Sequence, residues 1–322
     1  MRALRGRLAI ATVVALASAG LAAGCGSSSS SSTSTSGTSA NLTATPDINV
    51  QEDPKVVAEL PSSVKSKGTL TVAEDATYAP DEFIAQDGHT VIGMDADLAK
   101  ALGQAMGLNV DVKNVGFDAI IPGLAANKYD LGMSSFTITK EREKTVDFVS
   151  YAQAGTSFYV KADGGPDIGS LADLCGHSVG VERGTIQATA TEEQDKKCKA
   201  NGEPGVALSV FPDQNAANLA VQSGRAEVGM ADSPVAVYLA SQSNRVFKLT
   251  GEPFGTAAYG IAMPQGGGLA QPVQDALKDV MADGTYDKIF SYWGLEANPG
   301  ATNGCPCTID NPEINPTNVP PN

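Results

Sequence analysis

The chain has 322 residues, of which 42% are hydrophobic and 18% charged, and its formal net charge is −14. This length and apolar content allow two domains with real hydrophobic cores. The acidic balance argues against nucleic acid and against an anionic lipid surface as partners of the folded part. The two histidines, His89 and His177, stand in no catalytic or metal-binding spacing, so we expect no catalytic residue, no metal and no cofactor.

The N-terminal segment has the features of a signal peptide. Residues 1–24 begin with three arginines, continue with an apolar run and end in the small residues LAAG before Cys25. The apolar run is too short to span a bilayer, which favours a signal peptide over a membrane helix. LAAGC resembles a lipobox, which implies cleavage before Cys25 and lipid attachment to its thiol, with a plain secretory signal as the alternative. We therefore expect an extracytoplasmic protein, lipid-anchored to the outer face of the cell membrane.

Residues 25–53 are interpreted as a tether. Most of this segment, residues 26–40, is almost entirely Ser, Thr and Gly, which cannot bury enough apolar surface to offset the entropy lost on ordering. No second long apolar run follows, so we expect no membrane-spanning segment. Without the three arginines of the signal peptide the net charge is near −17, which favours solubility outside the cell.

Strand and helix patterns alternate from residue 69 onward, which is typical of an α/β protein. The elements predicted first are a buried strand at 69–73, a helix capped by Asp95 with an apolar face up to Met106, a strand at 109–113, a helix at 117–127, and strands at 129–134, 146–151 and 154–162. The sequence DGGP at 163–166 ends the last of these strands.

A second α/β unit follows. Its predicted elements are strands at 177–182, 206–211 and 226–231 and helices at 185–200, 213–223 and 234–241. A strand at 259–264 and a helix that begins near Leu269 and ends at Asp283-Gly284 come next. The remaining residues, 297–322, are rich in Pro, Asn and Thr and are predicted to be irregular or disordered.

One stretch, residues 130–151, combines a strand end with hydroxyl residues and a single arginine. Backbone N–H groups of residues 135–137 and the guanidinium group of Arg142 could face one anion. A carboxylate is the ligand group that suits these donors. The alternative is that the charged residues KEREK are only a solvated surface run.

Four stretches of the chain carry a resemblance to a known family. They are TVAEDATYAPDEF at 71–83, GMDADLAKALGQAM at 93–106, FDAIIPGLAANKYDLGMSSFTITKERE at 117–143, and YGIAMP with ADGTYDKIFSYWG near the end. In this order they resemble the family 3 extracellular solute-binding proteins, the amino-acid receptors of ABC importers. The resemblance covers nearly everything from residue 68 to residue 294.

This resemblance implies a two-lobed α/β fold of the periplasmic-binding-protein type (type II) with two hinge crossovers. Lobe 1 would comprise 54–160 and 256–296, and lobe 2 would comprise 161–255. The implied function is binding of a free amino acid between two closing lobes for the permease subunits of an ABC importer. From the residues themselves we expect a basic or polar amino acid. We expect a monomer that is not an enzyme.

In lobe 1, the resemblance assigns three residues to the carboxylate end of the ligand. Arg142 is expected to grip the α-carboxylate, because a planar fork suits two-point contact. Ser135 and Thr137 are expected to offer backbone N–H and hydroxyl groups to the same end, with local hydrogen bonding at a strand end as the alternative role.

In lobe 2, the resemblance assigns Asp232 to the α-ammonium group of the ligand. The alternative for Asp232 is a helix cap, since Asp is a favoured cap. Thr185 and Gln187 are expected to act as donors at a helix N-terminus that also meets the carboxylate, and Thr185 could equally be a cap.

The side-chain end of the ligand is assigned to four residues. Tyr78 and Phe117 are expected to flank the ligand, and Asp75 and Glu182 to face its far end. Two carboxylates there would repel an acidic side chain and suit arginine, lysine or glutamine. Alternatively, Glu182 pairs with its neighbour Arg183 or points to solvent.

The cysteines suggest at least one disulfide. Cys175 and Cys198 lie in the second unit of a protein expected outside the cell, so we predict a disulfide between them. For Cys305 and Cys307, a disulfide or free thiols are favoured over a metal site, because no histidine lies nearby.

Two other functional classes stay open at this point. Some proteins with the implied fold are extracytoplasmic dehydratases of the prephenate or arogenate type, and a pair of carboxylates such as Asp75 and Glu182 could do acid–base work. A ligand-sensing module is the second alternative. Against the dehydratase, the combination of Arg142 and Asp232 suits an amino-acid zwitterion.

Overall fold

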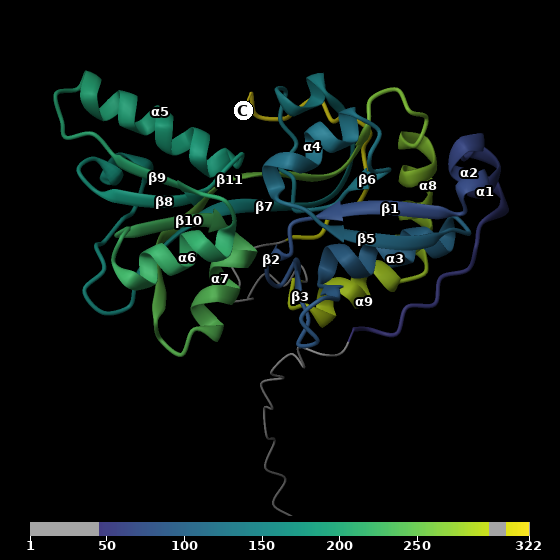
Figure 1. Cartoon of the computed structure of the whole chain (residues 1–322), viewed down its shortest axis with the longest axis horizontal. Helices are drawn as coiled ribbons and strands as arrows, with labels where there is room; N and C mark the ends of the chain where they lie inside the picture. The colour runs from purple at the N-terminus through teal and green to yellow at the C-terminus, as the bar shows by residue number, and fades with distance from the viewer. Residues whose placement is uncertain (1–44, 296–306, 322) are drawn as a thin grey trace, which may run out of the picture. The chain divides into compact units, whose positions relative to one another are not determined.

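The computed structural model describes residues 45–295 and 307–321, and Figure 1 shows the arrangement of its elements. The predicted signal peptide, the lipidation site Cys25 and most of the tether lie outside the described residues, as does Cys305. Within the described part of the chain, no helix is both long and apolar enough to cross a membrane.

An eight-stranded mixed sheet runs through the described chain. Its strand order is β5-β1-β6-β11-β7-β10-β8-β9. The strands are β1 (Thr69–Glu74), β5 (Asn109–Asn114), β6 (Leu131–Gly132), β7 (Val146–Lys161), β8 (Ser178–Glu182), β9 (Ala207–Phe211), β10 (Val228–Asp232) and β11 (Phe247–Pro264). β1 is parallel to β5 and β6, and β8 is parallel to β9 and β10, whereas β7 and β11 are antiparallel to their neighbours. The predicted α/β class is confirmed, with one antiparallel pair joining two groups of parallel strands.

That antiparallel pair is longer than the sequence predicts. The two strands predicted at 146–151 and 154–162 are one continuous strand, because Ala152 and Gln153 stay extended and pair with Tyr259 and Ala258 of β11. β11 likewise begins well before the strand predicted at 259–264. The predicted lobe boundaries fall at the end of β7 and within β11, and they stay a prediction.

Helices lie on both faces of the sheet (Figure 1). They are α1 (Pro54–Glu59), α2 (Ser62–Lys67), α3 (Met94–Ala105), α4 (Phe117–Ala125), α5 (Ile186–Ala200), α6 (Gln214–Ser223), α7 (Ser233–Gln242), α8 (Ala270–Ala282) and α9 (Thr285–Tyr292), with 3-10 turns η1 (Arg142–Lys144) and η2 (Leu171–Leu174). In Figure 1, α5 covers one face of β8 to β10, while α6 and α7 cover the other. A small antiparallel sheet of β2 (Thr77–Tyr78), β3 (Glu82–Ile84) and β4 (Val91–Ile92) precedes α3.

The start of α3 differs from the expectation that Asp95 caps it. Gly93, with a φ of 133°, is the cap residue, and a Cβ atom there would lie 2.3 Å from the carbonyl oxygen of Asp81. Only glycine fits this position without a shift of the backbone. Asp95 lies in the first turn instead, where its carboxylate accepts the N–H of Ser135 at 2.9 Å.

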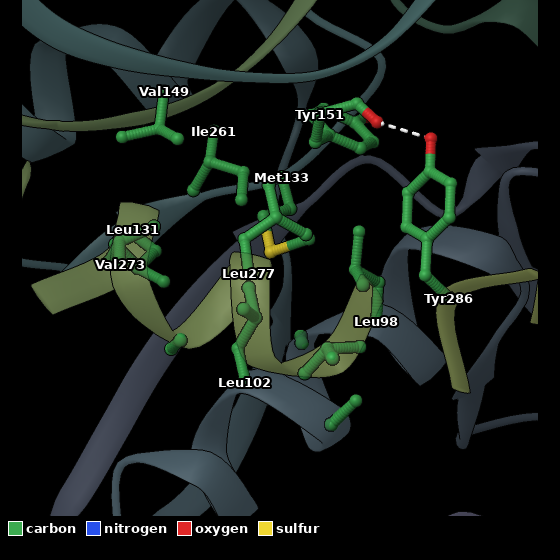
Figure 2. Close-up of a cluster of buried hydrophobic side chains, with 14 of the residues drawn as sticks. Leu98, Leu102, Leu131, Met133, Val149, Tyr151, Ile261, Val273, Leu277 and Tyr286 are labelled. Atoms are coloured by element: carbon green, nitrogen blue, oxygen red, sulfur yellow. Dashed lines mark hydrogen bonds between the residues drawn. The ribbon is translucent and has the colours of Figure 1, made fainter. Parts of the chain in front are cut away.

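The larger hydrophobic core lies between the sheet and helices α3, α8 and α9 (Figure 2). Leu98 and Leu102 of α3 pack there with Leu277 of α8, and the hydroxyl of Tyr286 donates to the carbonyl oxygen of Tyr151 at 2.7 Å. A second core draws its buried residues only from the chain between residues 158 and 230. Separate cores are what a two-lobed fold requires.

Two features of the cysteines are visible. Cys175, after η2, and Cys198, near the end of α5, form the predicted disulfide. Cys307 is buried in the larger core and is also disulfide-bonded.

The C-terminal segment 307–321 is packed against the sheet, although its composition predicts an irregular or disordered tail. It contains one isolated bridge, between Ile314 and Val149 of β7, and forms no regular element. The described part of the segment is irregular, one of the two states that the composition predicts. Composition reports how little apolar surface a segment can bury, but not whether a neighbouring strand edge can bind its backbone, as it does here.

Candidate functional site

One small cavity gathers most of the predicted binding residues. Eight of the ten line it, together with Ile186. The eight are Tyr78, Phe117, Ser135, Thr137, Arg142, Thr185, Gln187 and Asp232. The cavity has a volume of about 10 Å³, room for about one water molecule. An amino acid therefore requires the side chains that face one another here to move apart.

Arg142 is the first residue of η1, and its guanidinium group lies over two aromatic rings. Its Cζ atom is 5.3 Å from the ring centroid of Phe117 and 5.3 Å from that of Phe136. Nη1 donates to the carbonyl oxygen of Thr137 at 2.7 Å, and Nη2 donates to that of Gly184 at 3.0 Å. Burial lowers the pKa of Arg142 to about 10, so the side chain is still a cation at neutral pH.

Asp232, the last residue of β10, carries a buried carboxylate. Its Oδ1 atom accepts from Nε2 of Gln187 at 2.6 Å, and its Oδ2 atom accepts from the hydroxyl of Tyr259 at 2.8 Å. Although Asp232 directly precedes α7, its side chain makes no capping hydrogen bond. Burial raises its pKa to about 6, while the two donors and the charge of Arg142 favour the ionised form. At neutral pH the cavity thus holds an anion and a cation.

The two residues at the start of α5 have structural roles. Thr185 is the N-cap, because its Oγ1 atom accepts from the N–H of Ala188 at 3.2 Å. Nε2 of Gln187 donates to Oγ1 of Thr156 at 3.0 Å as well as to Asp232, so this amide holds the carboxylate in place.

Ser135 has both donors engaged by carboxylates. Its N–H donates to Asp95, and its hydroxyl donates to Oδ2 of Asp81 at 2.8 Å. The neighbouring Ser134 hydroxyl donates to Oε1 of Glu82 at 2.6 Å. Ser135 has a left-handed backbone conformation, with a φ of 49°. Because its N–H and hydroxyl donate to Asp95 and Asp81, neither donor is directed at a ligand in this arrangement.

A group of four carboxyl side chains lies behind Ser134 and Ser135. We call Glu74, Asp81, Glu82 and Asp95 the buried acidic group; each is fully buried. Burial raises the pKa of all four, to about 6 for Asp95, and neighbouring carboxylates raise it further for the other three. Among the residues that the structure describes, no cluster of side chains is arranged to hold a metal ion.

Asp75 lies beside the cavity and holds the helix that carries Phe117. Its Oδ2 atom accepts from the N–H of Phe117, the first residue of α4, at 2.8 Å, and its Oδ1 atom accepts from the hydroxyl of Thr77 at 2.7 Å. The ring of Phe117 is stacked against that of Tyr78, with 5.9 Å between centroids.

Glu182, the last residue of β8, has a buried carboxyl group that is 1% exposed. Neither of its oxygens makes a hydrogen bond of standard geometry with the described residues, but the Tyr78 hydroxyl and the Asp75 carboxyl lie close enough to shift its pKa. Burial raises its pKa to about 9, and the nearby Asp75 contributes to the shift. Its alternative partner, Arg183, lies 3.4 Å from Asp118 instead.

Sequence reasoning missed two residues of this site. Ile186, the first residue of α5, lines the cavity, and Tyr259 orients Asp232. Tyr259 belongs to YGIAMP, one of the stretches that carry the family resemblance, where the pattern predicts only a strand. A polar hydroxyl in an otherwise apolar strand was the available signal.

A larger cavity, of about 290 Å³, lies between α6 and α7. Asn218, Gln222, Tyr238 and Phe247 are among the residues that line it, and none of its lining residues carries a charge. It therefore lacks the paired charges that a zwitterion requires, whereas the smaller cavity has them.

Comparison with known proteins gives consistent matches. The family model of the bacterial extracellular solute-binding proteins, family 3, matches residues 70–296. The arginine-binding protein ArgT of Corynebacterium glutamicum is 29% identical over 244 residues, which cover 76% of this chain and 80% of ArgT.

Two solved structures have the same architecture. An ancestral arginine-binding protein bound to arginine is 38% identical, with a TM-score of 0.64, and the match covers 70% of this chain and 98% of that one. An ancestral amino acid-binding protein, a precursor of cyclohexadienyl dehydratase, is 36% identical with a TM-score of 0.64, and the match covers 72% and 97%.

Proposed function

The chain belongs to the bacterial extracellular solute-binding proteins of family 3, and we propose that it binds a basic amino acid, with arginine as the first candidate. Members of this family are extracytoplasmic, and the relatives in the comparison are amino-acid-binding proteins rather than enzymes. The permease subunits of an ABC importer are its proposed partners, and it would meet them as a monomer.

The observation that carries this proposal is the pairing of Arg142 and Asp232 at one cavity. Arg142 lies in the turn η1 directly before β7, Asp232 ends β10, which pairs with the later part of β7, and each influences the pKa of the other. An amino acid presents a carboxylate and an ammonium group on one carbon, so a zwitterion can satisfy both at once. Neither half of the protein offers both charges alone, which favours closure around the ligand.

Support for a cationic ligand comes from Glu182. Its buried carboxyl lies next to Asp75 and makes no hydrogen bond of standard geometry with the described residues, and a guanidinium or ammonium group would donate to both carboxyls. An acidic side chain would add a further negative charge to this end. The similar proteins that bind arginine agree with this preference.

We further propose that residues 1–24 are a lipoprotein signal peptide and that a lipid on Cys25 anchors the protein at the membrane. The support is the sequence LAAGC after an arginine-led apolar run, followed by a Ser-rich tether. An extracytoplasmic receptor kept near its permease needs either such an anchor or a confining compartment.

A dehydratase is the second candidate. One observation favours it: Glu182 is a protonated carboxyl at neutral pH, the form required of a general acid. The solved amino acid-binding protein that preceded a dehydratase is a relative of comparable similarity. Turnover of prephenate or arogenate would support this candidate over a receptor.

A thermal-shift panel of the standard amino acids tests the proposal. A ligand at a hundredfold excess over its dissociation constant adds about 2.7 kcal/mol to stability. We expect clear shifts with arginine and lysine and none with glutamate or aspartate. A shift with an acidic amino acid alone would overturn the basic specificity and leave the receptor function standing. No shift with any amino acid, after unfolding and refolding to remove carried-over ligand, would contradict the receptor itself.

A further inference from the structure

The C-terminal strap, residues 307–321, follows an edge of β7 that no other strand of the described residues covers. β10 pairs with β7 only at residues 156–160. Along the earlier half of β7, the strap supplies the missing partner. Gln153 N–H donates to the carbonyl oxygen of Cys307 at 2.9 Å, and Ser150 N–H donates to that of Glu313 at 2.9 Å.

The middle of the strap is fixed by Asn315. Its backbone N–H donates to the carbonyl oxygen of Phe148 at 2.9 Å, and its side-chain Oδ1 accepts the N–H of Phe148 at 2.7 Å. Its Nδ2 atom also donates to Asp147 at 3.1 Å. The register of the strap along β7 is therefore set by one side chain as well as by backbone pairing.

The end of the strap reaches the turn that carries Arg142. The N–H of Lys140, two residues before Arg142, donates to the carbonyl oxygen of Pro320 at 3.0 Å. Val319 packs against the hydrophobic cluster that contains Phe117 and Phe136. These are the two rings on which the guanidinium group of Arg142 lies.

Proline makes this segment suited to such a role. Pro312 and Pro316 are buried, and Pro320 supplies the carbonyl oxygen that holds Lys140. Proline restricts the unbound chain, which lowers the entropy lost when the strap is ordered. It also donates no N–H, so the strap can cover a strand edge without presenting a regular new edge.

We propose, resting on the proposed function, that the end of the strap is a positioning element for ligand binding. It holds the turn at residues 139–145 through the hydrogen bond between Lys140 and Pro320. Through Val319 it also supports the cluster that contains the two aromatic rings in contact with Arg142. The guanidinium fork is thereby held in the orientation that a carboxylate needs. The strap would not contact the ligand, and its effect on affinity would pass through Arg142.

The test compares residues 40–322, one compact unit, with the same protein lacking residues 317–322. The deletion keeps Asn315 and the pairing with β7 but removes the contacts of Val319 and Pro320. We expect the dissociation constant for arginine, measured by calorimetry, to rise about tenfold. Amide hydrogen exchange in the peptide 138–145 should also accelerate, with or without ligand.

A double-mutant cycle separates positioning from general destabilisation. In an Arg142→Lys background, the same deletion should change affinity by about twofold or less, because the fork that it positions is already absent. Val319→Ala, which keeps the full chain, should reproduce part of both effects. Asn318→Ala is the matched control, since Asn318 is an exposed neighbour in the same segment, and it should behave as the wild type.

Unchanged arginine affinity in the deletion variant would overturn the strap proposal, and so would unchanged exchange in peptide 138–145. If the intact protein binds no amino acid, the proposed function fails, and the exchange measurement still decides whether the strap fixes the turn. If the deletion lowers affinity equally in the wild-type and Arg142→Lys backgrounds, the strap stabilises the fold but does not position Arg142, which also contradicts the proposal.

Discussion

The Tyr259 hydroxyl, in the C-terminal half of β11, donates to Oδ2 of Asp232 at the end of β10 over 2.8 Å. Gln187 occupies the other oxygen of the same carboxylate. The proposed ammonium-binding group is thus held from two sides before any ligand arrives, and its orientation depends on residues that do not need to touch the ligand.

Tyr259→Phe should therefore weaken amino-acid binding while keeping the fold. Loss of a hydrogen bond to a charged group costs about 1.5–3 kcal/mol, so we expect the dissociation constant to rise roughly 10- to 100-fold. Calorimetric titration measures this. Tyr159→Phe is the control, because it removes another buried hydroxyl, bonded to Asn218 at 2.6 Å, and should lower stability without a change in affinity. Unchanged affinity in Tyr259→Phe would show that Asp232 needs no such support.

Binding of arginine should release a proton from Glu182. Burial raises the pKa of this carboxyl to about 9, so it is protonated in the ligand-free protein at pH 7. A guanidinium group beside it favours the carboxylate, so about one proton should leave per arginine bound, and affinity should rise between pH 7 and pH 9. Titrations at pH 7 in phosphate and in Tris, which differ in ionisation heat, give the number of protons released.

Glu182→Gln is the matched variant for this effect. It keeps the shape of the side chain but carries no proton to release, so the heat of binding should no longer depend on the buffer. Arginine affinity should fall roughly 10- to 100-fold, with a smaller loss for glutamine. If the heat of arginine binding to the wild-type protein is the same in phosphate and in Tris, the cationic group of the ligand does not lie beside Glu182.

The buried acidic group should make the ligand-free protein more stable in mild acid. Burial raises the pKa of Glu74, Asp81, Glu82 and Asp95 in the folded state. Their contribution is complete below the pKa of the unfolded carboxyls, near 4, and is lost as pH rises through the folded values, about 6 for Asp95. The thermal midpoint should therefore be higher at pH 5 than at pH 8.

Asp81→Asn tests that assignment. The amide can still accept the hydroxyl of Ser135, but it no longer titrates, so the dependence of the midpoint on pH should become shallower. A midpoint that rises from pH 5 to pH 8 in the wild type would mean that these carboxyls are not the groups that control stability in this range.

Cys25→Ser should move the protein from the membrane fraction to the medium. The substitution removes the thiol that the proposed lipid occupies while leaving the tether and the folded part unchanged. Cell fractionation with immunodetection measures the distribution, and the intact mass of the wild type should include the acyl additions. A variant that remains in the membrane fraction would contradict the lipid anchor.

Periodicity placed most of the elements that carry the site. β1, α3, α4, β8 and α5 agree with the prediction within a few residues, because each has a clear apolar period or a cap such as Thr185. Periodicity could not reveal that β7 is one strand, because nothing in the pattern of residues 152 and 153 indicates that the chain stays extended between the two predicted strands. The short helices α1 and α2 also lack enough turns to show a period.

The residues of the site could be predicted from the family resemblance rather than from periodicity. Nothing in the local sequence places Asp232 beside Arg142, because their proximity results from two distant elements that the sheet brings together. The resemblance could not assign Ser135 fully, since its donors are engaged by Asp81 and Asp95. Asp81 belongs to one of the stretches that carry the resemblance, but only the structure connects it to the buried acidic group.

The most direct test of the account is a calorimetric titration of arginine into residues 40–322 after unfolding and refolding, with Arg142→Ala in parallel. We predict saturable binding at a micromolar dissociation constant, about −8 kcal/mol. Arg142→Ala should lose about 2–5 kcal/mol of this while remaining folded. Equal affinity in the two proteins, or no binding of arginine or any other standard amino acid by the wild type, would contradict a zwitterion held by Arg142 and Asp232.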